Sequence, residues 1–321
     1  MTLWEAPSLI DFAVDPNWPR AWREGTARLL SVRPGQSPSI GWGDAVGDST
    51  LDGSPAGLRS SRDMRFDPQQ HFYLGQVDRT PVFGWLDRDD GTTSHGGTSV
   101  GGSANSDEGS GGRGARSGGV TAGRVGLRGW LARATSVDTE LAMRAVALAN
   151  FHDSSGFCSV CGKPTVPQDL GRSRVCQDCD SVFFPRTDPA IIIAITADER
   201  ILLGHHQGWA DRQVSVFAGF VEAGESLEQA VYREVGEEVG LDLAQVRYIG
   251  SQPWPMPRSL MMGFTATAVS TDARPDGEEI TDARWFTRDQ LCQAVADQTV
   301  TLPPPGSIAS RLIGDWVGSK D

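Results

Sequence analysis

Two sets of side chains in this sequence have the types and spacing of metal ligands. The first is four cysteines in two Cys-x2-Cys pairs, separated by residues 162–175. Such pairs lie on tight turns and together supply four thiolates to one tetrahedral Zn²⁺. Four protein ligands close a site, so we expect one structural zinc per chain at Cys158, Cys161, Cys176 and Cys179. The alternatives, buried thiols or a redox pair, fit the double spacing less well.

The second set lies in GFVEAGESLEQAVYREVGEEVGL, residues 219–241. Three carboxylates there, spaced i, i+3 and i+4, share one face of a helix: Glu234, Glu237 and Glu238. Like charges at this spacing repel, so one interpretation is a solvated acidic face relieved by Arg233. The other is a cation site, because Mg²⁺ and Mn²⁺ take oxygen ligands and bridge phosphate oxygens.

The helix that must position these carboxylates has clear limits. Ser226 followed by Gln229 is a capping-box start, and Gly240 suits the end. An apolar stripe at i, i+4 spacing gives the helix a buried side: Leu227, Val231 and Val235.

This segment also matches a known pattern. Gly219, Glu225 and the run Arg233-Glu234-Val235-x-Glu237-Glu238-x-Gly240-Leu241 reproduce the Nudix box, so the chain resembles the Nudix superfamily. The resemblance implies an α/β/α sandwich with a mixed sheet, in the α+β or α/β class. It also implies hydrolysis of a nucleoside diphosphate linked to another group, with two or three Mg²⁺ or Mn²⁺ as cofactors.

The resemblance assigns roles to the box residues by position. Glu234 and Glu238 are the principal metal ligands with Glu237 in support, and a salt bridge from Glu225 to Arg233 orients the helix. We take Glu238 as the general base, because a carboxylate beside the attacking water can accept its proton. Metal contacts implied outside the box are the backbone carbonyl of Ala218 and the carboxylate of Glu279, with Glu278 as the alternative.

A proline-rich segment beyond the box narrows the assignment. SQPWPMPRSLM (251–261) has prolines at alternate positions, so we expect a rigid wall of the substrate site outside any regular helix or sheet. It resembles the SQPWPFPxS signature of the NADH pyrophosphatase subfamily, with Met256 where phenylalanine is usual. FCSVCGKP and LPPPGSIASRLI also resemble that subfamily, and the resemblance runs from about Ala142 to the C-terminus.

The subfamily resemblance implies a substrate and its contacts. The reaction is hydrolysis of the central P–O–P bond of NAD(H) to NMN(H) and AMP, together with removal of NAD caps from RNA 5′ ends. Phe220 and Phe184 would stack on a base, Phe184 from the other subunit of a homodimer, although such aromatics are often core. Arg258 is a candidate for phosphate or stacking contacts or else a surface charge, and Arg128 is a weaker candidate. The substrate-binding residues so implied are Gln252, Pro253, Trp254, Pro255, Met256, Pro257, Arg258, Ser259, Phe220, Phe184 and Ala309.

The chain divides into three expected parts: a small N-terminal α+β domain (1–150), a zinc ribbon (151–186) and a Nudix catalytic domain (187–321). Segment 71–87 predicts two strands joined by a turn at Asp78–Pro81, and 127–154 predicts a helix. The Gly/Ser-rich stretch 89–123 buries too little apolar surface to order itself, so we expect a flexible insert in which His95 has no role.

Composition excludes some classes of protein. The formal net charge of -12 disfavours general electrostatic binding to the nucleic-acid backbone, although it is compatible with a small basic site. The strongest apolar run, residues 190–195, has the length of a strand, and acidic residues near the N-terminus do not suit a signal peptide. We therefore expect a cytoplasmic protein without a membrane partner. Cys292, alone on a predicted helix, is expected in the core.

Two other functions stay open. One is hydrolysis of ADP-ribose or a dinucleoside polyphosphate by the same chemistry. The other is RNA binding by the zinc ribbon with an inactive Nudix domain, which the intact carboxylates and the net charge disfavour. The sequence does not choose among NADH, NAD⁺ and NAD-capped RNA as the preferred substrate.

Overall fold

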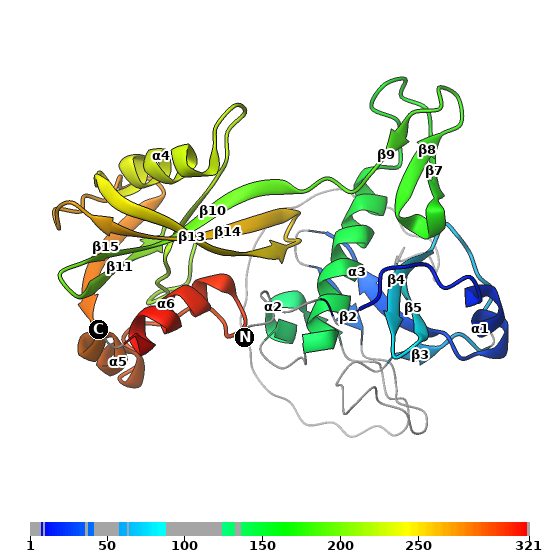
Figure 1. Ribbon diagram of the computed structural model, residues 1–321, viewed down its shortest axis with the longest axis horizontal. Coiled ribbons are helices and arrows are strands. Elements are labelled where there is room, and N and C mark those ends of the chain that lie inside the picture. The colour runs from blue at the N-terminus through cyan, green and yellow to red at the C-terminus, as the bar shows by residue number, and fades with distance from the viewer. Residues whose placement is uncertain are drawn as a thin grey trace, which may run out of the picture.

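The computed structural model describes residues 8, 10–35, 38–41, 58–62, 64–87, 124–131 and 136–319. Two lobes lie side by side, with an N-terminal sheet in one and a C-terminal sheet in the other (Figure 1). The expected insert at 89–123, with His95, lies outside the described residues.

The N-terminal lobe packs one sheet against a long helix. Its elements are α1 (Trp18–Glu24), β1 (Arg28–Arg33), β2 (Ser39–Gly41), β3 (Arg59–Ser60), β4 (His71–Val77), β5 (Thr80–Leu86), β6 (Arg124–Gly126), α2 (Leu127–Leu131) and α3 (Ser136–Ser154). The two strands predicted in 71–87 are confirmed as β4 and β5, joined by a turn in which Asp78 and Arg79 have φ of 49° and 63°. The helix predicted over 127–154 is instead two helices, α2 and α3.

A small three-stranded sheet follows α3 and is fastened to its end. It contains β7 (Thr165–Gln168), β8 (Ser173–Cys176) and β9 (Val182–Phe183), with a short 3₁₀ turn at Asp169–Gly171. His152 of α3 donates from Nε2 to the carbonyl of Gly171 at 2.8 Å and accepts at Nδ1 from Arg174 at 3.0 Å. Because these groups are buried, their bonds fix the sheet on the helix.

The C-terminal lobe is built on a mixed sheet of order β13-β14-β10-β11-β15, with β12 paired to β10. β10 and β14 are parallel, and the other pairs are antiparallel. The strands are β10 (Asp188–Ala197), β11 (Arg200–His206), β12 (Phe217–Phe220), β13 (Leu243–Trp254), β14 (Ser259–Ala268) and β15 (Ile280–Thr287).

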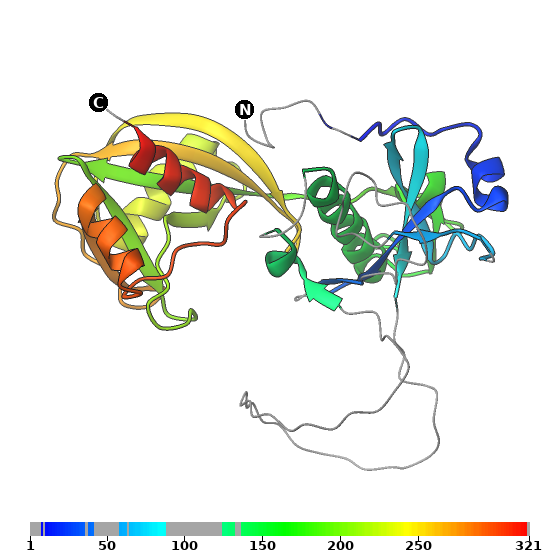
Figure 2. The ribbon, with the colours of Figure 1, turned by 90° about the horizontal axis from the view of Figure 1, so that it is seen from below.

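Alternate residues of β10 face opposite layers of helix. Ile191 and Ile193 pack in one core with α4 (Leu227–Val239), whereas Ile192 packs in a second core with α5 (Arg288–Ala296) and α6 (Ile308–Gly318). Figure 2 shows α5 and α6 on the side of the sheet away from α4. A strand covered on both faces is apolar at consecutive positions, which explains the run at 190–195. The expected α/β/α sandwich with a mixed sheet is confirmed.

The predicted limits of α4 are also confirmed. The Ser226 hydroxyl accepts from the Gln229 amide at 3.2 Å, and the Gln229 side chain accepts from the Ser226 amide at 2.8 Å. Gly240 ends the helix in the left-handed region with φ of 65°. Val231 and Val235 of the predicted stripe are fully buried, and Leu227 is partly buried against the same core.

Two expectations were wrong. The proline-rich segment is a β-hairpin, because β13 extends to Trp254 and β14 begins at Ser259, with Pro253 opposite Leu260. β13 is the edge strand, and at an edge a missing proline N–H can face away from the ladder. Cys292 is exposed on α5 rather than buried in the core. No helix in the described ranges is long and apolar enough to cross a membrane.

Candidate metal and substrate site

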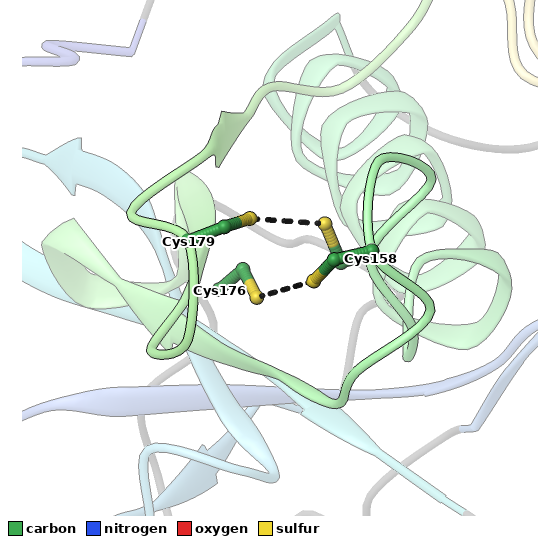
Figure 3. Close-up of side chains that lie close together, drawn as sticks. Cys158, Cys176 and Cys179 are labelled. Carbon is green, nitrogen blue, oxygen red and sulfur yellow. Dashed lines mark hydrogen bonds between the residues drawn. The ribbon is translucent and has the colours of Figure 1, made fainter.

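The four cysteines meet between two tight turns. In the first turn Cys158 N–H donates to the carbonyl of Lys163 at 2.7 Å, and Gly162 takes up a φ of 74°. Across the two turns, the Sγ atoms of Cys158 and Cys179 lie 3.6 Å apart and those of Cys161 and Cys176 lie 3.5 Å apart. All four lie within 4.8 Å of one another (Figure 3). The Ser181 hydroxyl beside Cys179 lowers the pKa of that thiol to about 6, which favours the thiolate that zinc binds.

A forked salt bridge holds the middle of α4 to the loop that precedes the helix. Arg233 donates from Nε to Glu225 Oε1 at 2.7 Å and from Nη2 to Glu225 Oε2 at 2.9 Å, as the resemblance implies. Nη2 also donates to the carbonyl of Phe220 at 2.8 Å, which ties the helix to β12. The Arg233 guanidinium lowers the pKa of Glu225 to about 2. Bidentate pairs of this kind fix geometry as well as charge.

Two carboxylates of α4 point into the protein rather than into solvent. Glu238 is 4% exposed, and its Oε2 has no hydrogen-bond partner. Burial, followed by the charges of Glu234 and Glu279, raises the pKa of Glu238 to about 8. Burial likewise raises the pKa of Glu234. A Cβ at Gly219 would lie 1.9 Å from Glu234 Cδ, so glycine at this position of β12 makes room for the carboxylate.

A third carboxylate near these two, that of Glu279, comes from the turn before β15. Asp276 accepts from the backbone N–H groups of Glu278 and Glu279 at 3.2 Å and of Ile280 at 2.8 Å, and so shapes the turn. Glu279 lines a cavity of about 200 Å³ together with Glu238, and Glu278 is not among the lining residues. Geometry therefore favours Glu279 of the two alternatives.

These carboxylates fit a hard divalent cation. Like charges gathered around a buried oxygen without a partner are costly unless a cation compensates them. Among the described residues, only the cysteine group brings three or more potential ligand atoms within 4.8 Å of one another. The carboxylates are thus more widely spaced than the thiolates.

The 200 Å³ cavity brings together many of the residues that sequence predicts. They come from β12, α4, β13, the turn before β15 and α6: Ala218, Glu238, Gln252, Trp254, Glu279 and Ala309. Arg128 of α2 also lines the cavity, with its guanidinium carbon 6.0 Å from the centre of the Trp254 ring. Acidic and aromatic side chains thus line the same cavity.

Comparison with known proteins identifies the two motifs. The NUDIX domain family matches residues 185–303, and the NADH pyrophosphatase zinc ribbon domain family matches residues 153–184. Residues 153–303 of this chain are thus similar to a zinc ribbon followed by a Nudix domain. The ribbon supports a structural zinc, which the cysteine cluster fits, and the Nudix domain implies a divalent metal.

Curated relatives match the same part of the chain. NAD-capped RNA hydrolase NudC of Pectobacterium atrosepticum is 44% identical over 178 residues, which are 56% of this chain and 65% of that protein. The protein of the same name from Salmonella schwarzengrund is 43% identical over 178 residues, 56% of this chain and 66% of its own. The chain thus spans just under two thirds of these relatives. A solved Nudix hydrolase from Nitrosomonas europaea is 23% identical, with 42% of this chain and 78% of its own covered at a TM-score of 0.36.

Not all the expected substrate residues lie at the Nudix cavity. Phe184, Pro257 and Arg258 line a separate cavity of about 400 Å³ between the lobes. Arg258 donates from Nε to Asp188 at 2.8 Å, so part of its charge is already engaged. Phe184 and Phe220 are 70% and 56% exposed and are therefore not core residues.

Two residues of the signature have structural contacts that sequence did not suggest. Gln252 is fully buried, and its amide donates to the carbonyl of Gly306 at 2.8 Å and accepts from the Ile308 N–H at 2.6 Å. It therefore holds the start of α6 as well as lining the cavity. Met256 packs against the core of the N-terminal lobe rather than lining the Nudix cavity.

Sequence reasoning missed His206 and Trp209, which also line the Nudix cavity. His206 Nε2 lies 3.5 Å from Glu279 Oε1, and its ring centroid lies 5.6 Å from that of Trp209. The Gly208 N–H donates to His206 Nδ1 at 3.0 Å, which orients the imidazole toward Glu279. A tryptophan in a polar loop was the available signal, but no regular spacing links it to the box.

Proposed function

We propose that this chain hydrolyses the pyrophosphate bond of NAD(H), giving NMN(H) and AMP, and removes NAD caps from RNA 5′ ends. The observation that carries the proposal is the 200 Å³ cavity, which joins Glu238 and Glu279 to Gln252 and Trp254 of the proline-rich signature. The names of the relatives state hydrolysis of NAD-capped RNA, which supports the same substrate class.

The residues fit two or three Mg²⁺ or Mn²⁺ held by Glu234, Glu238, Glu279 and the carbonyl of Ala218, with Glu237 in support. When bound, these ions neutralise the pyrophosphate and lower the pKa of the attacking water. Glu238 is our general base, because it lines the cavity and its Oε2 has no hydrogen-bond partner and can face the attacking water. Water oxygen bonds to one phosphorus as the P–O–P bond breaks, so each mononucleotide leaves with its own phosphate.

The aromatic groups would bind the dinucleotide. Trp254 offers a rigid surface beside the carboxylates, and exposed Phe220 lies on β12 at the edge of the box. Phe184 is exposed and lines a different cavity, which supports its use in the site of a second subunit of a homodimer. The remaining signature residues, Pro253, Pro255, Met256, Pro257, Arg258 and Ser259, would support this wall.

We also propose the division into domains 1–150, 151–186 and 187–321. In support, β1–β6, β7–β9 and β10–β15 form three separate sheets that fall within these ranges. A cytoplasmic location stays a prediction from the sequence.

A product assay tests the function. The purified chain with NADH and Mn²⁺ should release NMNH and AMP in equal amounts, resolved by chromatography, and an NAD-capped oligonucleotide should lose its NMN. Glu238→Gln should release both products at a rate lower by about 10²–10⁴-fold. Cleavage of ADP-ribose or a dinucleoside polyphosphate without cleavage of NADH would assign the alternative hydrolase function. Salt-sensitive RNA binding without hydrolysis would favour the RNA-binding alternative.

A further inference from the structure

Asn150 of α3 connects the N-terminal lobe to the hairpin that carries the proline-rich signature. Its Nδ2 donates to the carbonyl of Pro255 at 3.0 Å and to the carbonyl of Pro257 at 2.9 Å. Its Oδ1 accepts from the N–H of Gly35, in the loop after β1, at 3.0 Å. One amide thereby joins three segments that are far apart in the sequence, using both amide protons on the hairpin.

The turn of this hairpin has few N–H groups of its own to donate hydrogen bonds to its carbonyl oxygens. Pro255 and Pro257 have no N–H, so the turn offers few donors of its own, and its carbonyls point toward α3. Pro255 is buried, and Met256 packs against the core that α3 shares with the N-terminal sheet. The β13–β14 hairpin reaches from the C-terminal sheet to this helix (Figures 1 and 2). The turn is thus seated on the N-terminal lobe.

The residues on either side of the turn lead to the Nudix cavity. Trp254, just before it, lines that cavity with Glu238. Arg258, just after it, is held to β10 by an ion pair to Asp188 at 2.8 Å and by a backbone bond from Asp188 N–H to its carbonyl at 2.9 Å. Gln252 fixes the other end of the segment to α6. The position of Trp254 therefore depends on contacts within the C-terminal lobe on both sides. From the N-terminal lobe it depends on Asn150, on Arg128 and on the core against which Trp254 itself packs.

We infer that Asn150 is a positioning residue for substrate binding, through which the N-terminal lobe sets the place of Trp254 in the Nudix site. The inference rests on the proposed function, because Trp254 matters only if the cavity binds the dinucleotide. Asn150 lines the 400 Å³ cavity with Phe184 and Arg258 but not the Nudix cavity with its carboxylates, so its effect falls on binding and not on the chemical step.

Substitution by aspartate isolates the two bonds to the hairpin. Asn150→Asp keeps the size of the side chain and an acceptor for Gly35 but turns a carboxylate oxygen toward the two proline carbonyls. We expect the KM for NADH to rise about tenfold, the effect of losing two neutral hydrogen bonds, with kcat within about twofold. Asn150→Ser, which keeps one donor, should recover part of the loss. Ser154→Ala is the matched control. The Ser154 hydroxyl lies one turn along α3 from Asn150 and donates to the Asn150 carbonyl at 2.8 Å, so its bond stays within the helix.

The outcomes separate the inference from the function. Wild-type protein that does not cleave NADH overturns the proposed function, and this inference with it. If the wild-type protein cleaves NADH but Asn150→Asp has the same KM, the inference alone is overturned. A fall in kcat at unchanged KM in Asn150→Asp also overturns it. An equal change in Ser154→Ala would show only a general role in α3 and also overturns it. If thermal melting shows that Asn150→Asp does not fold, the KM of Asn150→Ser against wild type decides by the same criterion.

Discussion

The two ligand clusters of this chain are built in opposite ways. The cysteine cluster takes all its ligands from two local turns, and its sulfur atoms lie within 4.8 Å of one another. The carboxylate cluster takes its ligands from α4 and from the turn before β15, and one buried oxygen of Glu238 has no partner. The first is a closed set and the second an incomplete one.

The difference fits a structural role for the cysteine cluster and the proposed catalytic role for the carboxylate cluster. A closed tetrahedral set leaves no room for substrate, so its metal stabilises the fold. Spread carboxylates with raised pKa values leave positions for water and phosphate oxygens beside a metal. Substitutions in the two clusters should therefore change different properties of the protein.

Replacing a buried cysteine should have the largest effect, and on stability. Cys176 is fully buried, and Cys176→Ser removes one of four thiolates. Zinc binding by such ribbons contributes about 10 kcal/mol to folding, so we expect loss of the zinc and a melting temperature lower by many degrees. Metal analysis and calorimetry measure both. Exposed Cys292→Ser is the control, and full zinc content in Cys176→Ser would contradict the closed site.

Replacing a buried carboxylate should instead reduce activity and spare the fold. Glu238→Gln removes the proposed base and a metal ligand, so we expect kcat to fall by about 10²–10⁴-fold. The metal-free protein should melt at a higher temperature, because a buried charge without compensation is gone. Glu228→Gln, an exposed site on the first turn of α4, should change neither. A kcat within tenfold of wild type would remove Glu238 from catalysis.

Weakening the forked salt bridge should reduce activity by an intermediate amount and leave the cysteine cluster unchanged. Arg233→Lys keeps the charge but loses the two-point contact with Glu225 and the bond to Phe220. Charge-assisted bonds contribute about 1.5–3 kcal/mol each, so kcat/KM should fall about tenfold to a hundredfold at unchanged zinc content. Exposed Arg247→Lys on β13 is the control. Normal kcat/KM in Arg233→Lys would mean that charge alone orients the helix.

Features that depend on residues close together in the sequence could be predicted from it. The cysteine turns, the Ser226–Gln229 capping box and the Glu225–Arg233 pair all depend on neighbours a few residues away. The sandwich was predicted from the resemblance to the Nudix superfamily, and the cover on both faces of β10 explains the apolar run 190–195.

Features that depend on a distant partner could not be predicted. The proline-rich segment is a strand only because β14 pairs with it at the sheet edge. Gln252 is hydrogen-bonded to the residues at the start of α6, and Met256 packs against the core of the N-terminal lobe. No local sequence pattern indicates either contact. Trp209 reaches the cavity through the loop after β11, which has no periodicity. The division of the signature between two cavities thus comes from tertiary contacts.

The smallest effect expected is on the pH dependence of stability, and it involves the carboxylate cluster alone. Burial raises the pKa of Glu238 from 4.5 to about 8, so between these values the metal-free folded protein binds more protons than the unfolded chain. Stability from this group is therefore fully present below pH 4.5 and is lost as the pH rises toward about 8. Glu234, whose pKa burial also raises, acts in the same direction.

Saturating Mn²⁺ should reverse this slope, because the metal binds the ionised carboxylates and its affinity rises as they lose their protons. Melting temperatures between pH 5 and 9 (about one unit apart), with and without Mn²⁺, measure both slopes. Glu238→Gln should flatten the metal-free slope, whereas Cys292→Ser should leave it as in wild type. Parallel slopes with and without Mn²⁺ would mean that the buried carboxylates do not hold the ion, and the two clusters would then differ only in packing.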